Sequence, residues 1–98
     1  MRVEVRPAFD EAIMAAKPRV RKAAAKMLHL LQAFSLTELW SHTGLNFEKL
    51  HGMIEPASGA QLYSLRVSGA VRAIACLRQG PIVVLVSLHV QHDKAYRK

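Results

Sequence analysis

The stretch of sequence that decides the fold is QLYSLRVSGAVRAIACLRQGPIVVLVSLH, residues 61–89. It contains three runs rich in apolar and β-branched residues, which are 61–67, 70–78 and 82–89. Turn-forming residues separate them, first Ser68-Gly69 and then Gln79-Gly80-Pro81. Short runs of this kind, bounded by such turns, are typical of β-strands joined as hairpins. The second half of the chain therefore predicts a three-stranded antiparallel meander.

The pattern of apolar residues also predicts how the strands of the first hairpin are aligned. Successive side chains of a strand point to opposite faces, and burial selects the alignment that keeps one face apolar. A three-residue loop, 68–70, places Leu65 opposite Ala73 and Arg66 opposite Arg72, whereas a two-residue loop would spoil both faces. The expected result is one apolar face and one face on which two arginines are direct neighbours.

For the second hairpin, a two-residue loop at Gln79-Gly80 pairs Ala75 with Val84 and extends the same apolar face. Ser87 and His89 then fall on the face that carries the arginines. Directly opposed like charges destabilise a sheet. The pairing therefore favours an anion-binding face, although both arginines could instead reach solvent or pair with carboxylates.

The first half of the chain predicts helices that cover this sheet. Residues 2–6 alternate as a short strand that Pro7 ends, because proline cannot donate to a ladder. A helix follows over 10–16, and apolar residues at three- and four-residue steps predict helix over 18–34. Pro18 either separates two helices, which form a hairpin, or kinks a single one. Residues 35–44 indicate a short helix or turn, and 46–59 a segment that is mostly loop.

Composition limits the class of protein. The 98 residues suffice for one domain, 1–98, and carry 14 Lys and Arg against 7 Asp and Glu, a net charge of +7. Such a charge favours polyanionic partners, although a soluble protein can also simply be basic. No apolar run is long enough to span a bilayer, so no membrane role is expected. A single cysteine, Cys76, rules out an internal disulfide, and a cytoplasmic location is expected.

The order of these elements and three motifs resemble a known family. The motifs are FEKLHGM at 47–53, LYSLRVSGAVRAI at 62–74 and HVQHDKAYRK at 89–98. Together they resemble the RelE/ParE-type toxins of type II toxin–antitoxin modules. The resemblance implies an α+β fold of the RelE type, in which an N-terminal strand and two helices pack on a small, mostly antiparallel sheet. It also implies a cognate antitoxin as partner, in a toxin–antitoxin hetero-oligomer.

RelE-like members of this family cleave mRNA on the ribosome, with no metal and no other cofactor, through attack of the RNA's own 2′-hydroxyl on the adjacent phosphate. The resemblance implies that Arg72 holds that phosphate, and that a histidine serves as acid or base. It assigns catalysis to Arg72, His89, His92 and Tyr96. It assigns substrate binding to Arg66, Lys49, Lys94, Arg97 and Lys98.

The residues leave the activity open between alternatives. Ser64 stands where RelE-like nucleases tend to carry a lysine, so the general base is not identified, and Glu48 could supply it if its loop lies near the arginines. A ParE-like, non-enzymatic inhibitor of DNA gyrase and an inactive antitoxin-binding module are the other two readings. Trp40 and Cys76 are expected in the core, and His42 and His51 lack metal-ligand spacing.

Overall fold

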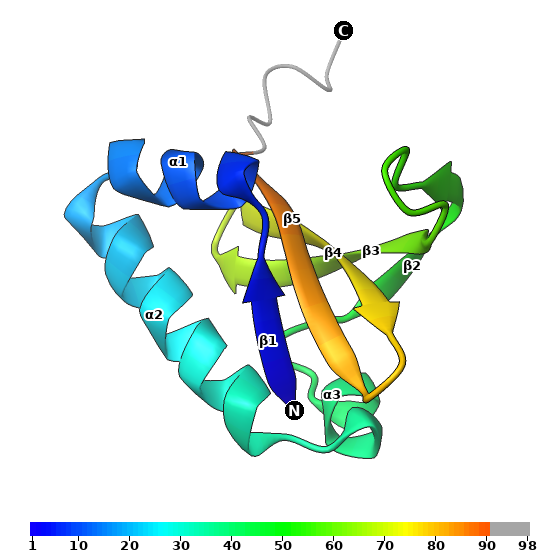
Figure 1. Cartoon of the computed structure of the whole chain (residues 1–98). Coiled ribbons are helices and arrows are strands. Elements are labelled where there is room, and N and C mark those ends of the chain that lie inside the picture. The colour runs from blue at the N-terminus through cyan, green and yellow to red at the C-terminus, as the bar shows by residue number, and fades with distance from the viewer. Residues whose placement is uncertain (91–98) are drawn as a thin grey trace, which may run out of the picture.

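The fold was determined as a computed structural model, which describes residues 1–90 (Figure 1). Within these residues there are three helices and five strands, an α+β arrangement. In chain order these are β1 (Arg2–Val5), α1 (Pro7–Ala15), α2 (Pro18–Ala33), α3 (Leu36–Ser41), β2 (Glu48–Ile54), β3 (Gln61–Ser68), β4 (Val71–Arg78) and β5 (Ile82–Val90).

The five strands form one sheet in the order β1-β5-β4-β3-β2. Three of the four strand pairs are antiparallel, and β1 lies parallel to β5. Helices α1 and α2 form a hairpin beside the β1–β5 side of the sheet (Figure 1). The predicted α+β class, with an N-terminal strand and two helices on a mostly antiparallel sheet, is confirmed.

The helices begin where the sequence supplies starting signals. Pro7 and Pro18 each stand in the first turn of a helix, where the missing N–H costs nothing. In α3, the Ser35 hydroxyl accepts from the Glu38 N–H while the Glu38 carboxylate accepts from the Ser35 N–H, a complete capping box. The helix expected over 10–16 therefore begins three residues earlier, at Pro7.

The main core lies between the helices and one face of the sheet, here called the covered face. Phe9, Met27 and Leu31 from α1 and α2 are at most 2% exposed. They belong to the same buried cluster as Leu65 of β3 and Leu85 of β5. Burial of apolar side chains on this scale is the dominant force that holds such a domain together.

The predicted alignment of the first hairpin is confirmed over most of its length. Arg66 lies opposite Arg72 and Leu65 opposite Ala73. The strands shift near the turn, where Ser68 rather than Val67 lies opposite Val71. This shift leaves the faces of the two arginines unchanged.

The predicted alignment of the second hairpin is wrong by one residue. Arg78 lies opposite Ile82, so the loop has three residues, and Ala75 faces Leu85 rather than Val84. The run 82–86 is apolar throughout because β5 is an interior strand, buried on both faces, so alternation could not fix its alignment. A bulge between Leu85 and Ser87 then shifts the strand by one further residue.

The segment 46–59 is also not mostly loop, because Glu48–Ile54 forms the edge strand β2. Only Glu48, Lys49 and Ile54 have direct partners in β3, and the residues between them bulge away from it. Gly52 adopts φ +77 within this bulge, a conformation that glycine adopts without steric cost. An edge strand that is exposed along most of its length has little apolar pattern, which is why the sequence did not reveal it.

Candidate functional site

The second face of the sheet, here called the open face, carries a small apolar patch and a polar end. The patch is built around Leu62, Cys76, Ile82 and Val84, which are all buried. Beyond it toward the β3–β4 turn lie the polar side chains of Ser64, Arg66, Arg72, Ser87 and His89. The polar end is therefore where the predicted site residues should meet.

Three of the predicted site residues are neighbours on three adjacent strands. Arg72 of β4 lies directly opposite Arg66 of β3 on one side and His89 of β5 on the other. The bulge in β5 makes this possible, because it places His89 rather than Leu88 beside Arg72. A row of two guanidinium groups and one imidazole thus crosses the end of the open face.

A cleft of about 550 Å³ opens beside this row. Arg72 and His89 line one side of it, and Glu48 and Asn46 contribute from the start of β2. Ser64 of β3 also lines the cleft. The remaining lining side chains are apolar: Leu50, Met53, Ile74 and Val90.

The charge on Arg72 has no counterpart among the described residues. Its Nη1 atom is shielded from solvent and has no hydrogen-bond partner within residues 1–90. A buried donor without a partner costs free energy, so an unsatisfied group of this kind calls for an explanation. A bound anion would provide the missing acceptor.

At the opposite end of the same face, in contrast, the positive charge of the arginines is balanced by a carboxylate. There Arg78 and Arg2 both lie within ion-pair distance of Glu4, at 2.6 and 3.8 Å. Within the described part of the chain, Arg66 and Arg72 take part in no ion pair, although Glu48 lines the same cleft as Arg72. Unpaired positive charge is therefore concentrated at the cleft end of the open face.

Two further groups in the cleft are held in place by hydrogen bonds. His89 Nε2 lies 2.8 Å from Ser87 Oγ, which leaves its Nδ1 as the other ring position for proton exchange. Asn46 Nδ2 donates to Glu48 Oε1 at 2.7 Å. The cleft thus combines a cation that can bind a phosphate ester with an imidazole and a carboxylate that can move protons around it.

Comparison with solved structures identifies the fold. The crystal structure of the archaeal RelE–RelB complex from Pyrococcus horikoshii matches with a TM-score of 0.68 and 15% identity, covering 94% of this chain and 96% of that one. YafQ from E. coli matches with a TM-score of 0.62 and 14% identity over the full length of both chains. The chain has the RelE fold. No family model and no curated protein sequence matches it.

Of the other predicted site residues, the structure describes Lys49 alone. Lys49 lies opposite Tyr63, which belongs to the covered-face core, so its register puts it on the face away from Arg72. His92, Lys94, Tyr96, Arg97 and Lys98 lie outside the described residues. The described chain thus brings together Arg66, Arg72 and His89 of the predicted set.

The structure also shows where Cys76, His42 and Trp40 lie. Cys76 is fully buried, as expected, and burial raises the pKa of its thiol. His42 Nδ1 accepts from the Leu45 N–H, and its ring lies 5.1 Å from that of Phe34. Trp40 packs edge-on against Phe47 but is 47% exposed, so its expected place in the core is wrong. Within residues 1–90 no group of His, Cys, Asp and Glu has the arrangement of a metal site.

A second hollow, of about 530 Å³, lies against α1 and is lined by Pro7, Asp10, Glu11, Met14 and Ala15. It contains no cation and no histidine, unlike the cleft. The cleft beside Arg72 is therefore the candidate functional site.

Among residues 1–90 there is no helix long and apolar enough to cross a membrane.

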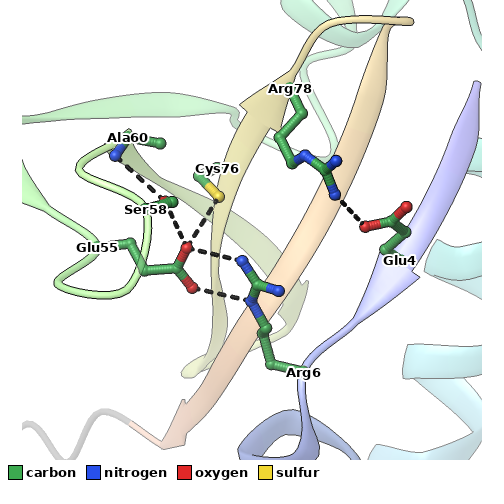
Figure 2. Close-up of polar contacts among 7 residues, drawn as sticks. All are labelled: Glu4, Arg6, Glu55, Ser58, Ala60, Cys76 and Arg78. Atoms are coloured by element: carbon green, nitrogen blue, oxygen red, sulfur yellow. Dashed lines mark hydrogen bonds and ion pairs between the residues drawn. The ribbon is translucent and has the colours of Figure 1, made fainter.

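Sequence reasoning missed one prominent contact in this chain. Arg6 forms two hydrogen bonds with the buried carboxylate of Glu55, at 2.9 and 3.0 Å (Figure 2). This contact holds the pKa of Glu55 at about 2, chiefly through the hydrogen bonds from Arg6 and also through one from Ser58. The two residues are 49 positions apart, and nothing in the local pattern of either indicates the pairing.

Proposed function

We propose that this chain is the toxin of a type II toxin–antitoxin module and that it cleaves mRNA on the ribosome in the manner of RelE. The observation that carries the proposal is that Arg72 lines a cleft beside His89 while its Nη1 atom has no hydrogen-bond partner within residues 1–90. The RelE fold supports it, because the likeness covers nearly the whole chain.

The proposed reaction breaks one phosphodiester bond without a metal. The 2′-hydroxyl oxygen of the RNA attacks the adjacent phosphorus, and the bond from phosphorus to the 5′-oxygen breaks. The products are a 2′,3′-cyclic phosphate and a free 5′-hydroxyl. One group must take the proton from the 2′-hydroxyl, another must protonate the departing oxygen, and a cation must balance charge on the phosphoryl oxygens.

The cleft offers a residue for each task. Arg72 presents a planar fork of N–H donors to the phosphate, the geometry that guanidinium groups match best. In this proposal Glu48, whose carboxylate accepts a hydrogen bond from Asn46, takes the proton of the 2′-hydroxyl, and His89 donates a proton to the leaving oxygen. Arg66, next to Arg72, contacts the neighbouring phosphate.

The proposed partner outside catalysis is an acidic antitoxin. The net charge of +7 favours association with a polyanionic or acidic chain. The Pyrococcus RelE was crystallised in complex with RelB, and we propose an equivalent partner for this chain.

Primer extension on mRNA after induction of the protein in cells tests the activity. The wild type should produce discrete cleavage ends, and Arg72→Gln and His89→Ala should abolish them. Arg78→Gln is the matched control, because it removes an arginine from the same sheet face at the neutralised end and should cleave normally. Inhibition of gyrase supercoiling by purified protein, with no mRNA cleavage, would instead support the ParE-like alternative.

A further inference from the structure

The Arg6–Glu55 pair ties together two distant parts of the open face. Arg6 lies between β1 and α1, and its backbone N–H donates to Leu85 O at 2.8 Å. Its side chain reaches across the sheet to Glu55, which directly follows β2 (Figure 2). Nε lies 3.0 Å from Oε2 and Nη2 lies 2.9 Å from Oε1, so the contact is bidentate. Such a two-point contact fixes orientation as well as position.

Glu55 is also the residue on which the turn 55–60 is built. Its N–H donates to Ala60 O at 2.8 Å, and its carbonyl accepts from Gly59 N at 2.7 Å. The Ser58 hydroxyl donates to its carboxylate at 2.6 Å. The Glu55 side chain is 5% exposed and lies over Cys76, whose Sγ is 3.8 Å from Oε1. The carboxylate therefore closes the turn and also covers the apolar patch of the open face.

The segment just before Glu55 forms one wall of the cleft. Leu50 and Met53 line the cleft, and both belong to the bulge of β2 that leaves the ladder with β3. The residues 51–54 are all exposed. Gln61 of β3 ties the bulge to the sheet, because its Nε2 donates to Leu50 O at 2.6 Å and to Met53 O at 3.1 Å. The next fixed points along the chain are Ile54, which pairs with Gln61 of β3, and Glu55.

An ion pair is an unusual way to close an apolar patch. Burying two charges costs desolvation, and well-packed apolar side chains often stabilise as much or more. What the pair supplies instead is a single orientation of the turn, because its two parallel hydrogen bonds fix the geometry of the contact. Besides the ion pair, the wall is held by the Gln61 amide, by the pairing of Ile54 with Gln61 and by Leu50, which packs on the apolar patch. Few contacts therefore resist its opening.

We propose that Arg6 and Glu55 form a latch that holds the wall 50–55 against the sheet and so sets the shape of the cleft. They are positioning residues, acting on RNA through Leu50 and Met53 rather than by contact. This role rests on the proposed function only in that the cleft binds RNA; the latch itself is a property of the fold.

The thiol of Cys76 reports directly on the latch. It is the one cysteine of the 98 residues and lies beneath Glu55, so opening the turn exposes it. The reaction of the native protein with a thiol reagent should be slow, and Glu55→Gln and Arg6→Gln should each speed it by about tenfold or more. Arg78→Gln, which breaks the exposed pair with Glu4 on the same face, is the matched control and should react like the wild type.

Two further measurements separate the latch from general instability. The thiol reaction rate should not change with low urea concentrations, because a local opening exposes little surface compared with global unfolding. If either single variant fails to fold, Ser58→Ala, which removes one hydrogen bond to Glu55, should still raise the rate. Unchanged thiol reactivity in all of these variants would overturn the latch.

RNA cleavage kinetics test the positioning role. In Glu55→Gln and Ser58→Ala the KM for RNA should rise by about tenfold while kcat changes little, because the wall is displaced but Arg72 and His89 are not. Faster thiol reaction with an unchanged KM would overturn the positioning role while leaving the latch. A wild type that neither binds nor cleaves RNA would refute the proposed function, and the thiol results would still decide whether the latch exists.

Discussion

Replacing Glu55 with glutamine should destabilise the protein by an amount that depends on pH. The pKa of Glu55 falls from 4.5 to about 2 in the folded chain, because Arg6 and Ser58 donate hydrogen bonds to the carboxylate. Each unit of pKa difference between folded and unfolded states corresponds to about 1.4 kcal/mol, so the ionised carboxylate contributes up to about 3 kcal/mol. Because the Arg6 side chain is 35% exposed and partly screened by water, about 2 kcal/mol is the expected effect.

The direction of the pH dependence follows from which state binds the proton more readily. The folded-state pKa of Glu55 is the lower one, so the unfolded chain takes up the proton first as pH falls. The contribution is therefore fully present above pH 4.5 and is lost progressively as pH falls toward 2. Glutamine cannot titrate, and the difference in free energy of unfolding between wild type and Glu55→Gln should shrink across this window.

Urea unfolding, followed by far-UV circular dichroism between pH 7 and pH 2.5, measures this difference. Other carboxylates titrate equally in both proteins, so their effects cancel when the two are subtracted. Glu4→Gln is the matched control, because its surface pairs with Arg78 and Arg2 should contribute only about 0–1 kcal/mol. A difference for Glu55→Gln that stays constant over the whole pH range, or is absent at pH 7, would refute the reasoning.

Three further predictions concern the site and the core. Arg72→Gln should lower kcat/KM for RNA cleavage by about 10²–10³-fold without lowering the melting temperature, because its Nη1 has no partner within residues 1–90. RNA binding should weaken with salt, and Arg66→Gln should reduce the slope of log K against log salt by about 0.7, the contribution of one phosphate contact to single-stranded RNA, as titrations at several salt concentrations would measure. Leu31→Ala, at a fully buried position, should lower the free energy of unfolding by about 2–5 kcal/mol in urea denaturation.

The sequence predicted those parts of the fold in which local pattern and burial agree. In α2 the apolar stripe points into the core, with Ala24, Met27 and Leu31 all buried. The first hairpin was predictable because its strands alternate, so that a one-residue slip would have exposed Leu65. Alternation also placed Arg66 and Arg72 on one face, and that pairing is present in the structure.

The parts that the sequence did not predict depend on contacts between distant segments. The cleft wall belongs to an exposed edge strand whose residues follow no apolar period. Glu48 was considered as a base only on condition that its loop lay near the arginines, and its pairing with Ser64 meets that condition. The Arg6–Glu55 pair joins residues that are far apart in the chain, and single-sequence patterns carry no signal for such a contact.

The position of His89 shows how closely the site depends on one irregularity in β5. The hairpin loop has one residue more than predicted. This longer loop, without any bulge, would have turned His89 to the covered face. The bulge between Leu85 and Ser87 adds a second one-residue shift, so that His89 returns to the open face, now directly beside Arg72. The strand thus keeps Val83 and Leu85 in the core and presents His89 to the cleft, which a regular strand with this loop could not do. Bulges often redirect a side chain next to a functional site, and this one places the imidazole beside a guanidinium that forms no ion pair within residues 1–90.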